Sequence, residues 1–257
     1  MGSATTRGTR SRKGGVPTVL PDPAALRDGQ MALVLDPPGG PPGDAEPVVR
    51  EFLPRVVHIG SWLGRDAQRA LVEDFRAWAV PPAGLRHPRV PTGHLMTVQS
   101  VCLGWHWYPY AYTRTADDTD GAPVKPMPAG LVELGRRAVR DTFGPADGDA
   151  YAPDAAIVNL YAPGARLGLH QDGEEPAAAP VVTISLGDTA TFRLAGVDRR
   201  TGPFTDVELR SGDLVVFGGP NRRIFHGIPK VADGTGPQGL GLPPGRLSIT
   251  LRETGLE

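Results

Sequence analysis

The sequence has one cysteine, Cys102, among 257 residues, and it has no apolar run close to the length of a membrane-spanning helix. A single cysteine excludes an intramolecular disulfide and is compatible with a reducing compartment. A spanning helix needs about 18 or more consecutive apolar residues, and the basic first residues are not followed by the apolar segment of a secretory signal. We therefore expect a cytoplasmic protein with no membrane partner, in which Cys102 is a small buried apolar residue.

An excess of charge of either sign is also absent. The chain has 27 basic and 28 acidic residues, which gives a formal net charge of −1. This balance excludes a protein that binds nucleic acid through a uniformly basic surface, so any contact with phosphates must be local. The length favours one globular domain with tails, and we expect a monomer.

The first part of the chain has the composition of a tail. Residues 1–48 contain 16 glycine or proline residues and offer little aromatic surface for a core. Such a segment cannot offset its ordering entropy by burial, so we predict a disordered tail followed by a single domain over residues 49–257. The basic cluster in this tail is interpreted as solvated, and a functional basic anchor is the alternative.

Two segments, residues 65–78 and 128–143, have the apolar spacing of amphipathic helices. Prolines 81 and 82 end the first helix, and the Gly-Pro pair at 144–145 ends the second. The side chains expected to face the core are Ala67, Leu71, Phe75 and Trp78 in the first helix and Leu131, Leu134, Ala138 and Val139 in the second.

From residue 151 onward, short apolar runs alternate with turns rich in glycine, proline and aspartate, and no helical pattern separates them. This arrangement indicates an antiparallel double-sheet or barrel domain and argues against alternating βαβ units. The fold class is therefore α+β and mainly β, with a jelly-roll core that two helices precede. The predicted strands are residues 155–161, 167–171, 181–186, 191–194, 206–209, 214–217 and 247–252.

Aromatic side chains are concentrated in one turn-rich stretch after a predicted strand, although aromatics make up only 6% of the chain. Five of them lie within eight residues: Trp105, Trp107, Tyr108, Tyr110 and Tyr112. This crowding indicates a platform on which flat rings stack, and a satellite hydrophobic cluster is an equally good interpretation of the stretch alone.

A candidate metal site lies in the second half of the chain. In a strand, residues two apart point the same way, so His170 and Asp172 can bind one ion together. His226, which ends an apolar run and precedes a glycine, is the best third ligand. Two histidines and one carboxylate leave coordination positions open, which suits a non-haem Fe(II) oxygenase better than a closed zinc site.

The last predicted strand has a polar row and an apolar row. Arg246, Ser248, Thr250 and Arg252 share one face, while the leucines and isoleucine between them share the other. Two guanidiniums aligned on one strand suit a small dicarboxylate, because each can grip a carboxylate with two parallel hydrogen bonds. A 2-oxoacid could chelate iron at one end and meet arginine at the other, and residues 159 and 161 supply further donors. An exposed edge face is the alternative.

These motifs together resemble one known family. The stretch NLYAPGARLGLHQD at 159–172, ISLG at 184–187, SGDLVVFGG at 211–219, HGI at 226–228 and the two strand arginines look like the AlkB family of Fe(II)- and 2-oxoglutarate-dependent dioxygenases. The resemblance covers most of residues 95–252. It implies a double-stranded β-helix core over about 151–252, a nucleotide-recognition region over about 90–125, and use of Fe(II), 2-oxoglutarate and O2.

The resemblance also implies the role of each residue at the metal and co-substrate. His170, Asp172 and His226 would be the catalytic iron ligands. The distal carboxylate of 2-oxoglutarate would be held by Arg246 with Tyr161, while Arg252 would lie near its iron-chelating end. The remaining residues of this pocket are Asn159 and Ser248. The sequence departs from the family pattern at two positions: Ser248 stands in place of an expected asparagine, and Phe217 in place of an expected tryptophan.

The activity that the resemblance implies is oxidative demethylation of N-alkylated nucleobases, 1-methyladenine and 3-methylcytosine, in single-stranded or flipped-base DNA, with RNA as the alternative polymer. Trp105 would stack on the flipped base, and Tyr110 or Tyr112 would contact the nucleotide backbone. Glu174 retains a carboxylate near the cationic methylated base, although Gly173-Glu174 stands where a basic residue and an aspartate are expected. Local phosphate contacts would fall to Arg114, Arg199, Arg200, Arg222 and Arg223, and a solvated surface charge is the favoured alternative for each.

Two rival interpretations remain open from the sequence. The first is the same oxygenase chemistry on a tRNA base, a protein side chain or a small metabolite. The second is a non-catalytic metal-binding β-sandwich module, in which the two histidines and the aspartate hold zinc or nothing.

Overall fold

The structure is a computed structural model that describes residues 1–2 and 47–257. The predicted disordered tail, residues 1–48, lies outside the described residues except at its two ends. Cys102 is buried, as expected. In the described part of the chain, no helix is long and apolar enough to cross a membrane.

Two antiparallel sheets form the core of residues 47–257. The larger sheet has seven strands, in the order β1 (Val48–Leu53), β2 (Val56–Gly60), β11 (Leu214–Phe217), β8 (Val181–Gly187), β13 (Arg246–Arg252), β6 (Ala155–Tyr161) and β3 (Gln99–Leu103). The smaller sheet has four, in the order β10 (Thr205–Leu209), β9 (Thr189–Leu194), β12 (His226–Ala232) and β7 (Leu167–His170). A separate hairpin pairs β4 (His106–Tyr108) with β5 (Ala111–Thr113). The double-sheet core confirms the predicted fold class.

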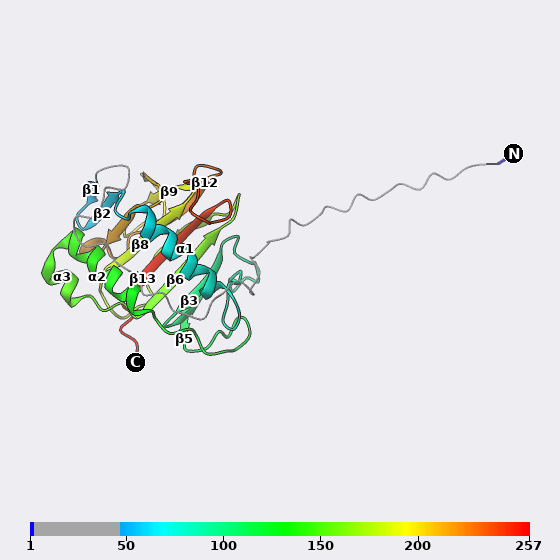
Figure 1. Ribbon diagram of the computed structural model, residues 1–257, viewed down its shortest axis with the longest axis horizontal. Helices are drawn as coiled ribbons and strands as arrows, with labels where there is room; N and C mark the ends of the chain where they lie inside the picture. The colour runs from blue at the N-terminus through cyan, green and yellow to red at the C-terminus, as the bar shows by residue number, and fades with distance from the viewer. Residues whose placement is uncertain (3–46) are drawn as a thin grey trace. The chain divides into compact units, whose positions relative to one another are not determined.

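The helices cover the outer face of the larger sheet. In Figure 1, α1 (Arg65–Ala79) lies across β8, β13 and β6, and α2 (Ala129–Phe143) lies beside it. All eight helical side chains predicted to face the core are buried. The helix α1 ends before Pro81, and α2 ends at Gly144, whose φ of 101° suits a residue without a side chain. A third short helix, α3 (Pro145–Ala150), was not predicted.

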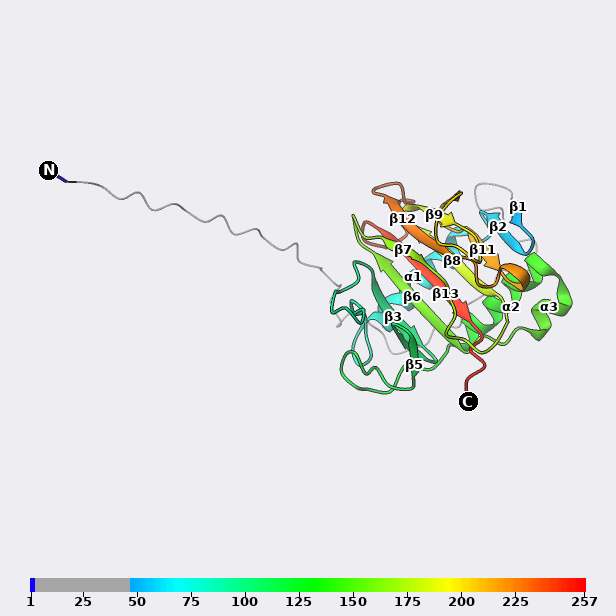
Figure 2. The same cartoon turned by 180° about the vertical axis from the view of Figure 1, so that it is seen from behind.

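A second apolar cluster fills the space between the two sheets. It joins Val181, Phe217 and Tyr161 of the larger sheet to Phe192 and Ile228 of the smaller one. Figure 2 shows the molecule from the side of the smaller sheet, with β9, β12 and β7 in view. The strand β13 contributes Leu247, Ile249 and Leu251 to the core under the helices. Its alternate residues therefore point between the sheets, as the sequence predicted.

The seven predicted strands are all present, with ends that differ by a few residues. The strands β1, β2, β4 and β5 were not predicted. In the β-rich part after residue 151 the prediction missed β12, which begins at His226 and contains Pro229. Proline is disfavoured inside a sheet because it cannot donate a ladder hydrogen bond. The pairing of β12 with β9 shifts register between Gly227 and Lys230, and this irregularity accommodates the proline. His226 therefore begins a central strand and does not simply end an apolar run.

Replacing Leu71 with alanine tests the packing of α1 on the larger sheet. Leu71 is fully buried, and truncation of such a side chain typically costs about 2–5 kcal/mol of unfolding free energy. We expect Leu71→Ala to unfold at a clearly lower urea concentration. Leu95→Ala is the matched control because Leu95 is 54% exposed. Equal urea midpoints for the two variants would contradict this packing.

Candidate metal centre and its two cavities

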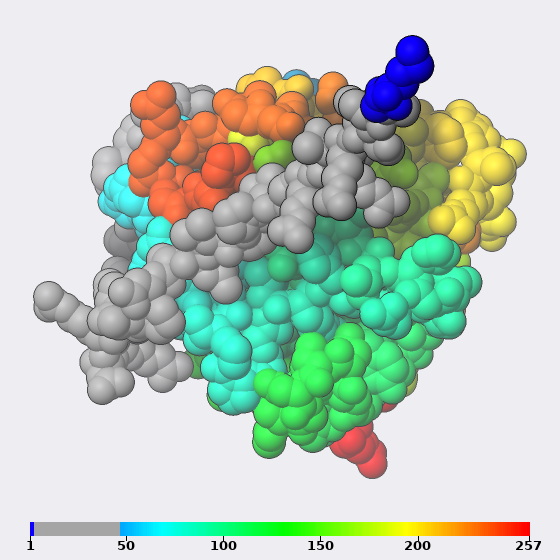
Figure 3. All heavy atoms as spheres, turned by 90° about the vertical axis from the view of Figure 1, so that its right-hand side faces the viewer, coloured from blue at the N-terminus to red at the C-terminus, as the bar shows by residue number. Residues whose placement is uncertain are grey.

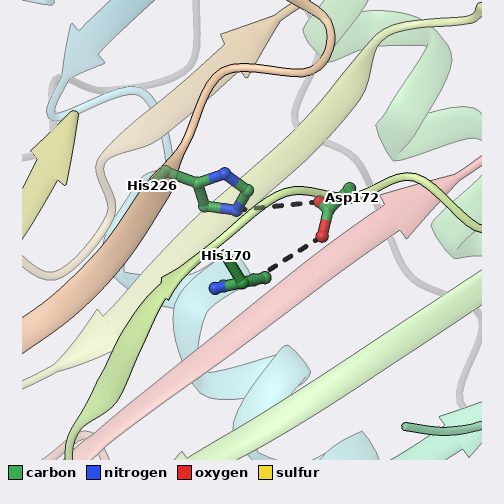
Figure 4. Close-up of side chains that lie close together, drawn as sticks. All are labelled: His170, Asp172 and His226. Carbon is green, nitrogen blue, oxygen red and sulfur yellow. Dashed lines mark ion pairs between the residues drawn. The ribbon is translucent and has the colours of Figure 1, made fainter. Parts of the chain in front are cut away.

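Three side chains from two distant parts of the chain meet between the sheets. His170 at the end of β7 and His226 at the start of β12 are directly paired across the smaller sheet, and their ring centroids are 4.4 Å apart. The candidate ligand atoms of His170, Asp172 and His226 all lie within 4.8 Å of one another. Figure 4 shows both rings pointing toward the carboxylate of Asp172. This is a group that could hold a metal ion.

The local geometry of His170 and Asp172 differs from the predicted one. The strand was expected to run to residue 171, but β7 ends at His170. Asp172 therefore comes from the segment that follows the strand, and the alternation of side chains along a strand does not place it. The pair still converges, with 3.6 Å between His170 Nε2 and Asp172 Oδ1.

Hydrogen bonds orient both imidazoles for metal binding. The Nδ1 atoms of His170 and His226 lie 3.0 Å from the carbonyl oxygens of Gly168 and Ile224. A carbonyl oxygen can only accept, so in the neutral rings Nδ1 carries the proton and the lone pair is on Nε2. The Nε2 of His226 lies 3.7 Å from Asp172 Oδ2. Burial, together with the nearby His170, lowers the pKa of His226 to about 4, which keeps this ring neutral.

Asp172 supplies the negative charge of the centre. Burial alone would raise its pKa, but the guanidinium of Arg252 holds the pKa well below the usual value. Arg252 Nη2 donates to Asp172 Oδ1 at 2.6 Å. The other carboxylate oxygen, Oδ2, is buried and has no hydrogen-bond partner. An ionised oxygen without a partner, facing an imidazole lone pair, is a site that fits a divalent cation.

An inner cavity of about 40 Å³ lies beside this group. The polar row of β13 lines it, together with Asn159, Tyr161 and Thr183. Arg246 is fully buried and donates from Nε to Ser185 Oγ at 2.8 Å. Its Nη1 and Nη2 atoms are buried without a partner. A buried guanidinium with two free donors fits the carboxylate of a small anion.

An outer cavity of about 350 Å³ also lies at the metal group. Its lining includes Trp107, Tyr110, Glu174, Arg166 and Arg200. In Figure 3, the blue-green region that contains β3 to β5 makes up much of one face, with the yellow segment near position 200 at its edge. His170 and Asp172 line both cavities. A metal ion held by these residues would therefore be next to both a polar inner cavity and a larger outer cavity with aromatic lining.

Trp105 does not line either cavity, contrary to the expectation that it stacks on a base. It is only 5% exposed, its Nε1 donates to Asp154 Oδ2, and the guanidinium of Arg114 lies 3.3 Å from its ring centre. Its indole nitrogen and its ring are thus both in contact with neighbours within the fold. Trp107, two residues later, lines the outer cavity instead.

The structure separates the two tyrosines that the sequence left as alternatives. Tyr110 lies in the turn of the β4–β5 hairpin, is 70% exposed and lines the outer cavity. The hydroxyl of Tyr112 is instead bonded to Glu175 and Arg252. Arg222, expected at a phosphate, is buried and donates to Glu175. Glu175 was missed by sequence reasoning, because a carboxylate next to Glu174 gives no sign of which of the two is buried.

Comparison with known proteins places these features in context. The sequence profile described as the 2OG-Fe(II) oxygenase superfamily matches residues 55–252. An Alpha-ketoglutarate-dependent dioxygenase AlkB homolog from Caulobacter vibrioides is 39% identical over 192 residues, which is 72% of this chain and 81% of that protein. AlkB from Escherichia coli is 37% identical over 196 residues, 74% of this chain and 86% of that protein.

A plant protein is similar over a longer stretch. DNA N(6)-methyladenine demethylase ALKBH1D from Arabidopsis thaliana is 33% identical over 220 residues, 77% of this chain but only 49% of that protein. This chain therefore spans about half the length of the plant relatives that it matches. A solved structure of OsALKBH1 superposes with a TM-score of 0.73 at 30% identity and covers 80% of this chain and all of that one.

Removing one imidazole tests whether the three side chains bind metal. We expect His226→Ala to weaken Co(II) binding, measured by calorimetric titration, by about 100-fold or more, because even indirect partners of metal ligands typically contribute 10–100-fold. His94→Ala is the control, since His94 is exposed and outside the group. If both variants bound Co(II) as the parent protein does, the metal site would not be where these residues meet.

Proposed function

The chain belongs to the 2OG-Fe(II) oxygenase superfamily and, within it, to the AlkB family, and on that premise we propose that it demethylates N-alkylated nucleobases with Fe(II), 2-oxoglutarate and O2. The observation that carries the proposal is the unpartnered Oδ2 of Asp172, which lies 3.7 Å from Nε2 of His226 in a group that also includes His170. His170, Asp172 and His226 would hold Fe(II) and leave coordination positions for 2-oxoglutarate and O2. The bound metal would supply the oxidising chemistry that hydroxylates an N-methyl group, after which formaldehyde leaves and the base is restored.

The inner cavity is proposed to bind 2-oxoglutarate. Arg246 would grip the distal carboxylate through its two free Nη atoms, because nothing else in the described structure satisfies them. Tyr161, whose ring centre lies 5.1 Å from the Arg246 guanidinium, would close the same end. Asn159 and Ser248 line the cavity between this end and the metal group. Arg252 would hold Asp172 in position near the end of 2-oxoglutarate that binds the metal.

The outer cavity is proposed to receive the nucleobase. A base within a duplex cannot reach a buried metal, so the target would be single-stranded or flipped out. Trp107, in place of Trp105, would provide the aromatic face, and the exposed Tyr110 would meet the nucleotide backbone. Glu174 lines this cavity and would favour a cationic base such as 1-methyladenine or 3-methylcytosine.

The finer features of the proposal concern partners and location. DNA is the expected polymer because the Arabidopsis relative is named a DNA demethylase, and RNA is the alternative polymer. The name of that relative also makes N6-methyladenine a base to be tested beside the two cationic ones. We further propose a monomer in the cytoplasm, in keeping with the single cysteine.

A turnover assay tests the proposed reaction. With Fe(II), 2-oxoglutarate and air, we expect formaldehyde from a 3-methylcytosine oligonucleotide in an amount matching the succinate formed. His170→Ala should lower both by at least about 100-fold, because a direct metal ligand is lost. Succinate without formaldehyde from DNA, a tRNA pool or N6-methyladenine oligonucleotides would favour another substrate class. Absence of succinate under all conditions would favour the non-catalytic module.

Replacing Arg246 tests the co-substrate pocket separately. Loss of one partner of a buried charge pair typically costs about 2–5 kcal/mol, so Arg246→Gln should raise the KM for 2-oxoglutarate about 30-fold or more. Its Co(II) affinity should stay close to that of the parent protein. The control is Arg210→Gln, since the side chain of Arg210 is 74% exposed. An unchanged KM in Arg246→Gln would remove this residue from the co-substrate site.

A further inference from the structure

A buried network of charges lies behind the candidate metal group, and the proposed reaction does not by itself require all of it. Its four members are Tyr112, Glu175, Arg222 and Arg252, and we call it the Arg252 network. Arg252 Nη1 donates to Tyr112 Oη at 2.9 Å and to Glu175 Oε1 at 2.7 Å. Arg222 Nη2 donates to Glu175 Oε2 at 3.1 Å. The hydroxyl of Tyr112 donates to Glu175 Oε1.

This network determines how Asp172 is held. The other end of the Arg252 guanidinium, Nη2, binds Asp172 Oδ1, and Arg222 Nη1 donates to the backbone carbonyl of Asp172 at 3.0 Å. Oδ2 is thereby left as the oxygen available to a metal ion. A guanidinium is planar and rigid, so the partners of Nη1 fix the direction in which Nη2 points. The position of the Asp172 carboxylate therefore depends on Tyr112 and Glu175.

The charges of the network are balanced once Asp172 is included. Burial alone would raise the pKa of Glu175, but Arg252 and the Tyr112 hydroxyl hold it below the usual value. Burial raises the pKa of Tyr112, which keeps its hydroxyl protonated and able to donate. Two carboxylates, Asp172 and Glu175, thus face two guanidiniums across a neutral phenol. A buried network in which the donors are paired with acceptors holds its side chains rigidly. Removal of one member makes the remaining side chains less rigid.

Tyr112 is the member that comes from outside the double-sheet core. It lies on β5, directly opposite Trp107 on β4, and residues paired in this way have neighbouring side chains. Trp107 lines the outer cavity and Tyr110, in the turn, lies at its edge. In the described part of the chain, no other side chain of the β4–β5 hairpin bonds to the Arg252 network. The Tyr112 hydroxyl is therefore the polar connection between the β4–β5 hairpin and the carboxylate at the metal group.

We propose that Tyr112 is a positioning residue that couples the β4–β5 hairpin to the metal centre through Arg252 and Asp172. The inference rests on the proposed function for its biological meaning, since the hairpin is there the wall against which the nucleobase lies. The coupling itself involves no substrate. Anchoring of the hairpin and binding of a metal ion strengthen each other, and by thermodynamic linkage each does so by the same factor.

Tyr112→Phe removes only the hydroxyl that joins the hairpin to the network. We expect the Co(II) affinity of the otherwise unloaded protein, measured by calorimetry, to fall about 10-fold, the lower end of the effect of indirect partners of a metal ligand. Tyr108→Phe is the matched control, because Tyr108 lies on the same hairpin and its hydroxyl has no hydrogen bond within the described residues. A merely structural role of the hairpin would leave Co(II) affinity unchanged in both variants.

Amide hydrogen exchange in the parent protein gives the reciprocal measurement. Saturating Co(II) should slow exchange across residues 106–113 by up to about 10-fold, while exchange in β10 at the edge of the smaller sheet should not change. This arm needs no variant, so it decides the question even if Tyr112→Phe does not fold. Unchanged exchange in the hairpin, or a folded Tyr112→Phe with the affinity of the parent, overturns the coupling.

The turnover assay distinguishes this inference from the proposed function. If the parent protein demethylates an oligonucleotide, Tyr112→Phe should form more succinate per formaldehyde than Tyr108→Phe does, because the base is held less firmly at the metal. If the parent protein demethylates nothing, the proposed function fails. The Co(II) affinity and the exchange of the hairpin still decide the role of Tyr112 in that case.

Discussion

The ion pair between Arg252 and Asp172 is the interaction on which the rest of the site depends. A buried carboxylate with no partner would take up a proton, because burial disfavours its charged form. Arg252 keeps Asp172 ionised and uses only one of its two oxygens, at 2.6 Å. The other oxygen stays charged and unpartnered and faces the imidazole of His226 at 3.7 Å. The positive charge of Arg252 thus allows Asp172 to be buried in its ionised form. Its free oxygen, Oδ2, can then bind a cation.

The double-sheet fold explains how these groups come together. Arg252 ends β13 in the larger sheet, while the two histidines lie on paired strands of the smaller sheet. The alternation of side chains along β13 sends the leucines under the helices and the arginines between the sheets. The same alternation thus produces an apolar core on one face and a charged cavity on the other. The packing of α1 and α2 against the apolar face of β13 therefore leaves its polar face to line the inner cavity.

The residues that sequence reasoning misplaced share a physical cause. Trp105 and Trp107 are of the same type and two positions apart, and only the contacts of Trp105 with Asp154 and Arg114 show which of them is withdrawn from the cavity. Glu174 and Glu175 are adjacent carboxylates, and only the buried guanidiniums select Glu175. The strand β12 was missed because Pro229 contradicts strand propensity, and a shift of register resolves the conflict.

The sequence by itself determined the α+β class, the two long helices, the strands of ordinary composition, the polar row of β13 and the identity of the three metal-binding candidates. These follow from periodicity and residue chemistry, which act over a few residues. Tertiary structure alone decided that Asp172 reaches the histidines from beyond a strand end, that Trp107 lines the outer cavity, and that Tyr112 joins the hairpin to Arg252. Those outcomes depend on contacts between residues far apart in the chain, such as the 140 positions that separate Tyr112 from Arg252. No local pattern encodes which of two similar neighbouring side chains such a contact will choose.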